Sequence, residues 1–262
     1  PLLSQSFDLK KVTYIVSDID KALAFEWVAL YLNNEQCTLS FILLNKGNSD
    51  LEDFLIDQGI PVKCVHLSLR WKILFPFMRL WLHLLTSRPD IIHTHLRYAS
   101  LLGITAGFFA GIKTRIHTRH NSSFHNIYHP HAVKTDQWVS RLSTKIVSIS
   151  DVVTDVLVDW EGTPDHKIVK IPHGFDLDYS KNVSTQRVDV LRGKYNVDGS
   201  RPVVGMISRY IEWKGVIYGI EAFKKVRKDY PDALLVLANA KGPDAGKVKK
   251  ALEELPNDAY LE

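Results

Sequence analysis

The sequence predicts an α/β fold with mainly parallel sheets, in which a complete N-terminal domain is followed by the first part of a second α/β domain. Short runs of β-branched residues alternate with longer segments whose apolar residues recur every three or four positions, which is typical of βαβ units. A polar stretch without clear periodicity separates two such series. The second series has only two or three strands, whereas a doubly wound domain needs about five.

The elements follow from these patterns in order. In the first domain we expect helices at 21–32, 51–58, 75–86, 99–110, 134–142 and 152–160, and strands at 12–17, 39–44, 62–65, 91–93, 114–118, 145–149 and 168–171. In the second, helices at 215–229 and 247–255 alternate with strands at 203–207, 234–238 and 259–261. The predicted domains therefore span 1–175 and 201–262, joined by a linker at 176–200 with a short helical pattern at 188–195. Pro1 in place of Met indicates a sequence without its natural start.

Composition argues against several classes of protein. The 262 residues carry a net charge of +4, and Lys and Arg form no continuous run, which argues against nucleic-acid binding. The two cysteines, Cys37 and Cys64, lack the spacing of a disulfide framework or a thiolate zinc site, which favours the reducing cytoplasm. The longest nearly apolar stretch, 101–112, is shorter than a bilayer span, so we expect neither a transmembrane helix nor a signal peptide.

The most specific signal is the stretch 207–215, ISRYIEWKG, which follows an apolar strand and opens a helix. Ligands collect at the carboxyl ends of parallel strands, where helix N-termini present free N–H groups. Arg209 can grip a phosphate with two donors, and Lys214 adds a second positive charge. The stretch has the outline of a diphosphate site. Without its context, however, an Arg and a Lys in such a loop are more simply interpreted as solvated surface charges.

Two further stretches lie in the N-terminal domain. The first is KIVSISD at 145–151 with KIVKIPHGFD at 167–176, and the second is PDIIHTH at 89–95 with RIHTRHN at 115–121. Taken singly, each is also typical of an ordinary αβ unit. Together with 207–215 they resemble family 4 glycosyltransferases in the same order along the chain, from residue 89 to residue 223.

This resemblance implies a GT-B fold of two Rossmann-like domains and a retaining transfer of a sugar from a nucleotide diphosphate donor to an acceptor hydroxyl. The implied acceptor is a glycan or lipid-linked molecule of bacterial-type cell-surface synthesis. Arg209 and Lys214 would hold the donor diphosphate without a metal or other cofactor, and His120 would be the catalytic residue beside the donor sugar. Its imidazole can hydrogen-bond a sugar hydroxyl or, if protonated, offset charge on the departing diphosphate. The residues expected to line the cleft are His95, Arg119, Ser150, His173 and Gly174.

A group of histidines and an aromatic, basic segment each allow an interpretation beyond simple packing. Seven histidines (93, 95, 117, 120, 125, 129 and 131) invite a metal site, but no HExxH or paired-cysteine pattern accompanies them, and we expect none. The aromatic and basic segment 70–85 reads as a helix that packs on the core, with Pro76 in its first turn and Arg79 and His83 on one face. The alternative is a contact with the inner membrane surface that brings a lipid-linked acceptor to the cleft, with Trp71 and Arg79 taking part.

The sequence departs from the family at both ends. The first strand is followed by Ser17-Asp18-Ile19-Asp20, without the glycine-rich loop of many members. The family's paired glutamates belong downstream of Glu262, and the adjacent Glu253 and Glu254 do not reproduce their spacing. We therefore expect this sequence alone to be inactive. Three alternatives remain: a nucleotide-sugar epimerase, a dinucleotide oxidoreductase, and a non-catalytic sugar-binding or scaffold module. The oxidoreductase is disfavoured because no Gly-x-Gly-x-x-Gly motif is present.

Overall fold

The computed structural model describes residues 9–32, 37–67, 73–181, 183–195, 202–239 and 241–262. The chain forms two compact units, Pro1–Asp176 and Leu177–Glu262. No helix in the described ranges is both long and apolar enough to cross a membrane. The stretch expected to be a linker carries two short helices, α8 (Leu177–Lys181) and α9 (Thr185–Lys194).

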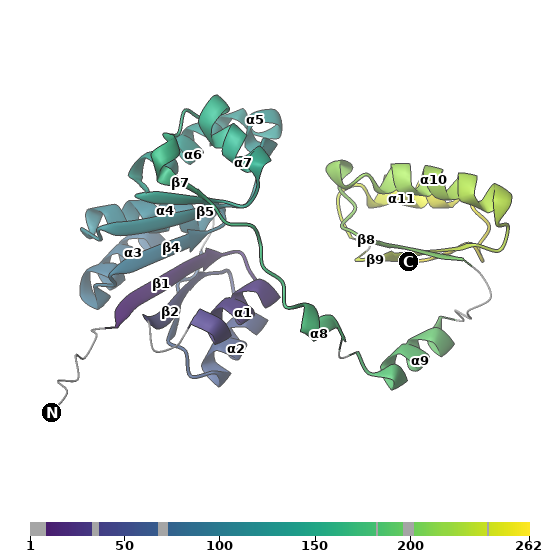
Figure 1. The fold of residues 1–262 in the computed structure, drawn as a ribbon, viewed down its shortest axis with the longest axis horizontal. Helices are drawn as coiled ribbons and strands as arrows, with labels where there is room; N and C mark the ends of the chain where they lie inside the picture. Colours follow the sequence, from purple (N-terminus) through teal and green to yellow (C-terminus); the bar gives the residue numbers. More distant parts are fainter. Residues whose placement is uncertain (1–8, 33–36, 68–72, 182, 196–201, 240) are drawn as a thin grey trace. The chain divides into compact units, whose positions relative to one another are not determined.

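A seven-stranded, fully parallel sheet forms the centre of the first unit (Figure 1). Its strands lie in the order β3-β2-β1-β4-β5-β6-β7. Their bounds are β1 Lys10–Ser17, β2 Cys37–Leu44, β3 Val62–Cys64, β4 Ile91–His95, β5 Thr114–Arg119, β6 Lys145–Ser148 and β7 Ile168–Lys170. This confirms the predicted α/β fold with a parallel sheet.

Helices cover both faces of this sheet, which is why its central strands are apolar on both sides (Figure 1). One face buries Tyr14, Val16 and Phe41 against α1 (Leu23–Leu32) and α2 (Asp50–Asp57). The other face buries Ile15 and Ile92 against α3 (Leu74–Ser87) and α4 (Arg97–Phe109).

Close packing of α4 on the sheet depends on glycine. A Cβ added to Gly103 would lie 2.9 Å from Thr94 Cγ2, and one added to Gly107 would overlap Ile92 Cδ1. These glycines therefore bring the helix backbone close to β4. The remaining helices of the unit are α5 (Phe124–Tyr128), α6 (Pro130–Leu142) and α7 (Asp151–Asp155).

The predicted helix at 152–160 is only partly α-helical. Ser150 caps α7, because its hydroxyl accepts the backbone N–H of Val153 at 3.3 Å. The chain then widens into a π-helix over Val156–Trp160, and such segments often lie at functional sites. A 3₁₀ turn at Asp165–Lys167 leads into β7.

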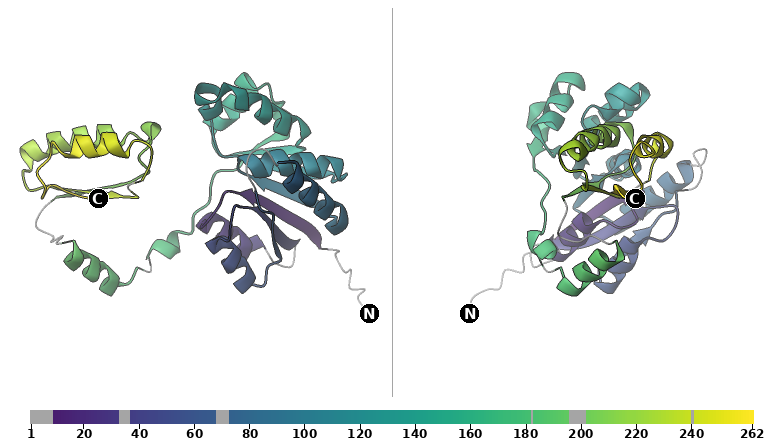
Figure 2. Two further views of the ribbon diagram at one scale, coloured as in Figure 1. Left: turned by 180° about the vertical axis from the view of Figure 1, so that it is seen from behind. Right: turned by 90° about the vertical axis from the view of Figure 1, so that its right-hand side faces the viewer.

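The second unit has a smaller parallel sheet in the order β10-β9-β8. Helices α10 and α11 lie on one face of this sheet (Figure 2). Apolar side chains of both helices pack on the sheet, including Ile220 and Phe223 of α10 and Val248 of α11. The bounds of these elements are β8 Val203–Ile207, α10 Val216–Asp229, β9 Leu234–Ala238, α11 Ala245–Leu252 and β10 Tyr260–Leu261.

Candidate functional site

The strand order of the first unit points to a candidate site at the carboxyl ends of β1, β4 and β5. The chain runs outward in one direction from β1 to β3 and in the other from β4 to β7, so the order reverses between β1 and β4. Ligands of open parallel sheets bind at this switch point. Leu96, directly after β4, has φ +70°, a strained conformation of a kind that gathers at functional sites.

Four histidines form a row at this edge, which we call the histidine row: His93, His95, His120 and His173. The rings of His93 and His95 lie 4.3 Å apart, since alternate residues of β4 share one face. Nδ1 of His95 and Nε2 of His120 are 3.0 Å apart, at hydrogen-bond distance. His173, after β7, stacks on His120 with 5.3 Å between ring centroids. The structure thus brings together three of the predicted site residues, His95, His120 and His173.

Burial lowers the pKa of three members of the row, His93, His95 and His120, and keeps these three rings neutral. Desolvation lowers the pKa of His120 to about 4, with a smaller effect from His173. The pKa of His93 is also lowered to about 4, first by burial and then by His120. That of His95 is lowered well below its ordinary value by burial and by the surrounding histidines. At neutral pH His120 is therefore suited to hydrogen bonding as an uncharged ring, rather than to offsetting charge as an imidazolium.

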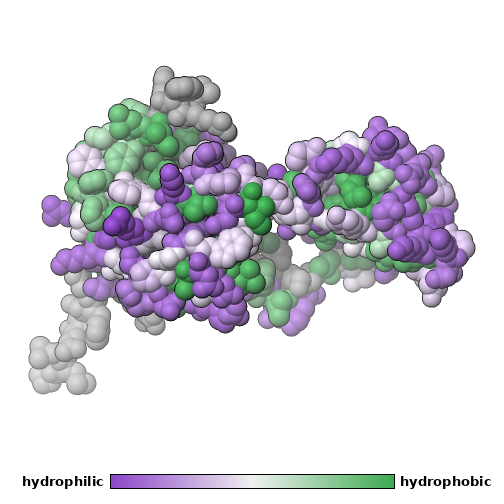
Figure 3. Space-filling view, turned by 90° about the horizontal axis from the view of Figure 1, so that it is seen from above, coloured by the Kyte–Doolittle hydropathy of each residue, from purple (hydrophilic) through white to green (hydrophobic). Residues whose placement is uncertain are grey.

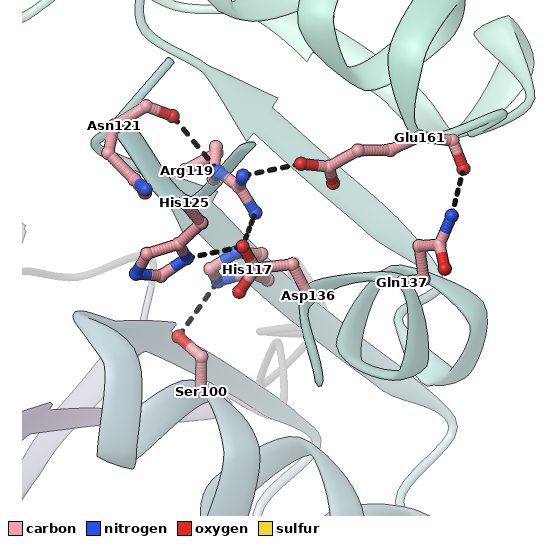
Figure 4. Close-up of polar contacts among 8 residues, drawn as sticks. All are labelled: Ser100, His117, Arg119, Asn121, His125, Asp136, Gln137 and Glu161. Carbon is pink, nitrogen blue, oxygen red and sulfur yellow. Dashed lines mark hydrogen bonds and ion pairs between the residues drawn. The ribbon is translucent and has the colours of Figure 1, made fainter. Parts of the chain in front are cut away.

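Arg119, the residue before His120, is buried in an internal network (Figure 4). Its Nη1 lies 2.9 Å from Asp136 of α6, and its Nη2 lies 2.6 Å from Glu161, which follows the π-helix. Its Nε donates to the backbone carbonyl of Asn121 at 2.9 Å. Asp136 also pairs with His125 of α5 at 2.5 Å. The Arg119 guanidinium thus ties β5 to α6 and the π-helix, and internal partners occupy all three of its nitrogens.

A cavity of about 220 Å³ lies beside this network. Its wall comes from the start of α4, the end of β5, and helices α5 and α6. On the sheet side, Nδ1 of His117 lies 2.9 Å from the Ser100 hydroxyl (Figure 4). Burial lowers the pKa of His117 to about 3, and the nearby positive charge of Arg119 is the second largest cause. The cavity is lined by Leu96, Arg97, Ser100, His117, Thr118, Arg119, His120, Asn121, Phe124, His125, Thr135, Asp136 and Val139.

The other expected cleft-lining residues have separate positions. Ser150 follows β6 at the carboxyl edge of the sheet, where its hydroxyl caps α7. Gly174 is exposed, and its backbone is outside the left-handed region that would require glycine.

The histidines do not assemble into a metal centre. His117 is opposite Thr94 in the β4–β5 pairing, so it lies on the other sheet face from His93 and His95. In the part of the chain that the structure describes, no group of three or more His, Cys, Asp or Glu side chains is placed to hold a metal ion.

The second unit carries Arg209 and Lys214 on the loop from β8 to α10. Backbone bonds on either side fix this loop, because Ser208 N donates to Ala238 O at 3.1 Å and Tyr210 N to Lys241 O at 2.9 Å. Lys214 ends a 3₁₀ turn, and Gly215, with φ +65°, then caps α10. Both cationic side chains are exposed, and within the described ranges neither forms an ion pair or a hydrogen bond.

Sequence reasoning missed Asp136 and Glu161 as parts of the site, and it considered His125 only as one of seven histidines for a metal site. Arg119 lies 42 residues before Glu161, and the intervening segment shows no motif that links the two. For Glu161 the sequence signal is only a carboxylate next to the largely apolar helix end Val156–Trp160, and such carboxylates are common on protein surfaces.

Comparison with known proteins identifies the family. A sequence model of glycosyltransferase family 4 matches residues 28–179. The chain is 24% identical over 216 residues to the UDP-Gal:α-D-GlcNAc-diphosphoundecaprenol α-1,3-galactosyltransferase of Escherichia coli, a match that covers 79% of this chain and 55% of that protein. The chain thus spans about half the length of this relative.

Solved structures share the fold. Anabaena HepE, in complex with UDP-glucose, superposes with a TM-score of 0.74 at 15% identity, over 96% of this chain and 68% of that one. The UDP-GlcNAc 2-epimerase of Neisseria meningitidis, bound to UDP-GlcNAc, gives a TM-score of 0.64 at 15% identity, over 96% and 72% of the two chains. At such identities these likenesses show the architecture alone, whereas the family match covers more than half of the sequence. The chain belongs to glycosyltransferase family 4.

Proposed function

We propose that this protein transfers a sugar from a uridine diphosphate donor to an acceptor hydroxyl, with retention at the transferred carbon. The observation that carries the proposal is the pair of exposed cations at the carboxyl end of β8 and the start of α10, Arg209 and Lys214, whose side chains form no ion pair with any residue that the structure describes. A diphosphate needs positive charge and free N–H donors, and this loop offers both. The relatives that contain UDP or use a UDP-sugar support uridine as the base.

In this proposal the first unit binds the acceptor and contacts the transferred sugar. His120 is a neutral ring that can hydrogen-bond a sugar hydroxyl or a phosphate oxygen. The cavity beside it, walled by α4, α5 and α6, is a candidate place for the acceptor. The E. coli relative is named for a diphosphoundecaprenol acceptor, so we propose a lipid-linked acceptor in cell-surface glycan synthesis.

Nucleotide binding tests the donor site directly. Isothermal titration of the chain with UDP and UDP-glucose should give measurable affinity in the presence of EDTA, because fixed cations replace a metal in this proposal. A hydrogen bond to a charged group contributes about 1.5–3 kcal/mol, so Arg209→Ala should weaken UDP binding by about 10- to 100-fold. Lys228→Ala, in the last turn of α10, is the matched control and should leave affinity unchanged. Equal affinities of the Arg209→Ala variant and the parent would contradict the donor site.

Epimerisation of a nucleotide sugar is a second candidate, because the Neisseria epimerase has the same architecture. An epimerase would convert UDP-GlcNAc without any acceptor. Incubation with UDP-GlcNAc alone, followed by sugar analysis, separates the two activities. Appearance of the 2-epimer would favour this candidate, whereas acceptor-dependent release of UDP would favour transfer.

We further propose that α3 rests on the cytoplasmic surface of a membrane. One face of this helix is exposed and apolar, with Leu74, Phe75 and Leu82 exposed by 69%, 68% and 52%. Arg79 is also exposed and can meet anionic headgroups. Apolar side chains gather on the edge of the first unit where Figure 1 draws α3 and α4 (Figure 3). Trp71, expected to take part, lies outside the described residues.

Vesicle flotation tests this contact. The parent chain should float with vesicles that contain anionic lipid, and Phe75→Ser with Leu82→Ser should reduce the bound fraction several-fold because the apolar face is lost. Val190→Ser with Leu191→Ser on α9 removes comparably exposed apolar side chains and should not change flotation. Equal flotation of both double variants would contradict a role for α3.

A further inference from the structure

His95 is a buried histidine whose side chain, within the described residues, hydrogen-bonds only to another histidine. Its Nδ1 lies 3.0 Å from Nε2 of His120, although the two residues are 25 positions apart in the sequence. The contact exists because β4 and β5 pair in parallel and place His95 opposite Thr118, two residues before His120.

Aromatic neighbours hold the His95 ring in one orientation. Tyr14 stacks on it at 5.2 Å with an interplanar angle of 13°, and Phe25 meets it edge-on at 5.0 Å and 83°. His93 lies 4.3 Å away on the same strand. The side chain is 7% exposed. Its Nδ1 is thus fixed against His120.

The other nitrogen of His95 determines which ring donates in this pair. Nε2 of His95 is buried without any hydrogen-bond partner in the described structure. A neutral imidazole carries one N–H and one lone pair. A buried N–H without an acceptor is more costly than a buried lone pair without a donor. The proton of His95 therefore belongs on Nδ1, where it is donated to Nε2 of His120.

We propose that His95 is a positioning residue that fixes His120 in its Nδ1–H tautomer. Because Nε2 of His120 accepts the hydrogen bond from His95, the single proton of the His120 ring is on Nδ1. No hydrogen bond among the described residues occupies that nitrogen. His120 then presents an N–H donor, which selects an oxygen acceptor, and we assign this acceptor to a hydroxyl of the transferred sugar. The functional part of this inference rests on the proposed sugar transfer.

Imidazole ¹⁵N spectra test the assignment without any ligand. With ¹⁵N-histidine labelling of the full chain at pH 7.5, long-range ¹H–¹⁵N correlations should show His95 and His120 both as Nδ1–H tautomers. Free neutral histidine in water favours Nε2–H, so this pattern would be distinctive. An Nε2–H signal for His120 in the parent protein overturns the proposal.

Two substitutions separate the hydrogen bond from packing. His95→Phe keeps an aromatic ring between Tyr14 and Phe25 but removes the donor, and His120 should revert to the Nε2–H tautomer. His95→Asn places an amide N–H near the position of Nδ1 and should keep His120 as Nδ1–H. If His120 remains Nδ1–H in the folded His95→Phe variant, His95 does not set the tautomer.

Affinity measurements connect the tautomer to the substrate. His95→Phe should weaken binding of UDP-glucose by about 5- to 10-fold, the value of one ordinary hydrogen bond, and should leave UDP affinity unchanged. His95→Asn should restore the UDP-glucose affinity. Failure of the parent chain to bind UDP contradicts the proposed function, but the tautomer experiment still decides the assignment of His95. Equal losses for UDP and UDP-glucose in His95→Phe overturn the positioning role.

Discussion

Replacement of Arg119 by methionine should destabilise the first unit severely. The Arg119 side chain is 3% exposed, and its partners Glu161 and Asp136 are 0% and 11% exposed. Removing one member of a buried ion pair costs about 3–5 kcal/mol, because the remaining charge is left without compensation. Domains of this kind have a free energy of unfolding of about 5–15 kcal/mol. Arg119→Met should therefore remove between about a fifth and all of the stability.

Urea unfolding followed by tryptophan fluorescence measures this loss. With an m-value of about 2–3 kcal/mol/M, the midpoint should fall by about 1–2.5 M. Arg141→Met changes an exposed arginine near the end of α6 and is a control that should shift the midpoint little. A loss below about 1 kcal/mol for Arg119→Met would refute the view that the buried network is energetically important.

The pH dependence identifies which unpaired charge causes the loss. Burial raises the pKa of Glu161, and Arg119 opposes that rise. Without Arg119 the folded-state pKa of Glu161 should move further above its unfolded value. The deficit of the variant should then be small at a pH below the unfolded pKa and should grow as the pH rises through the folded pKa. Arg119→Met combined with Glu161→Gln should have a smaller deficit at pH 8 than Arg119→Met alone. A deficit that does not change with pH would show that Glu161 is not its source.

The remaining predictions concern the buried histidines and a glycine of the second unit. Burial lowers the pKa of His93, His117 and His120 to about 4, 3 and 4. As the pH falls, these histidines are protonated in the unfolded state before they are protonated in the folded state. The free energy of unfolding should therefore be highest above about pH 6.5 and fall as the pH approaches 4, and each histidine should lower it by about 2 kcal/mol at pH 5. Urea midpoints independent of pH between 4.5 and 7 would contradict this. A Cβ on Gly242 would overlap the backbone of Tyr210 in the β8–α10 loop, and the φ angle of Gly242 is +156°. Gly242→Ala should therefore lower the melting temperature of the second unit, whereas Gly246→Ala, which meets open space, should not; equal melting temperatures would show that the loop can shift at little cost.

The sequence predicts most of the fold because strand and helix periodicities are local properties. Strands β8 and β9 have the predicted bounds, and β1 and β4 are extended by only two residues each. Helices α5 and α8 were not predicted, since five residues are too few to show a helical period. The π-helix was read as ordinary helix, because widening the turn leaves the apolar spacing nearly unchanged.

The site was predictable as an edge of the sheet but not as a set of contacts. His95, His120 and His173 each follow or end a strand, so their common location could be inferred from the strand order. The hydrogen bond between His95 and His120 depends on the register of β4 against β5, which sequence patterns do not give. Arg119 was expected to line the cleft. It lines the cavity, but three internal partners occupy its guanidinium nitrogens, because the carboxylates that surround it come from distant segments.

The central position of β1 has a consequence for synthesis of the chain on the ribosome. One edge of β1 pairs with β2, the next strand in the sequence, whereas the other edge pairs with β4, which is synthesised much later. The backbone N–H of Lys11 in β1, for example, donates to Asp90, 79 positions later. At about 5–20 residues per second this partner emerges roughly 4–16 s after β1. During that interval β1, β2 and β3 can form only a three-stranded intermediate with an unpaired apolar edge. Translation pauses between residues 18 and 90 should therefore increase co-translational aggregation, whereas pauses after residue 176 should not.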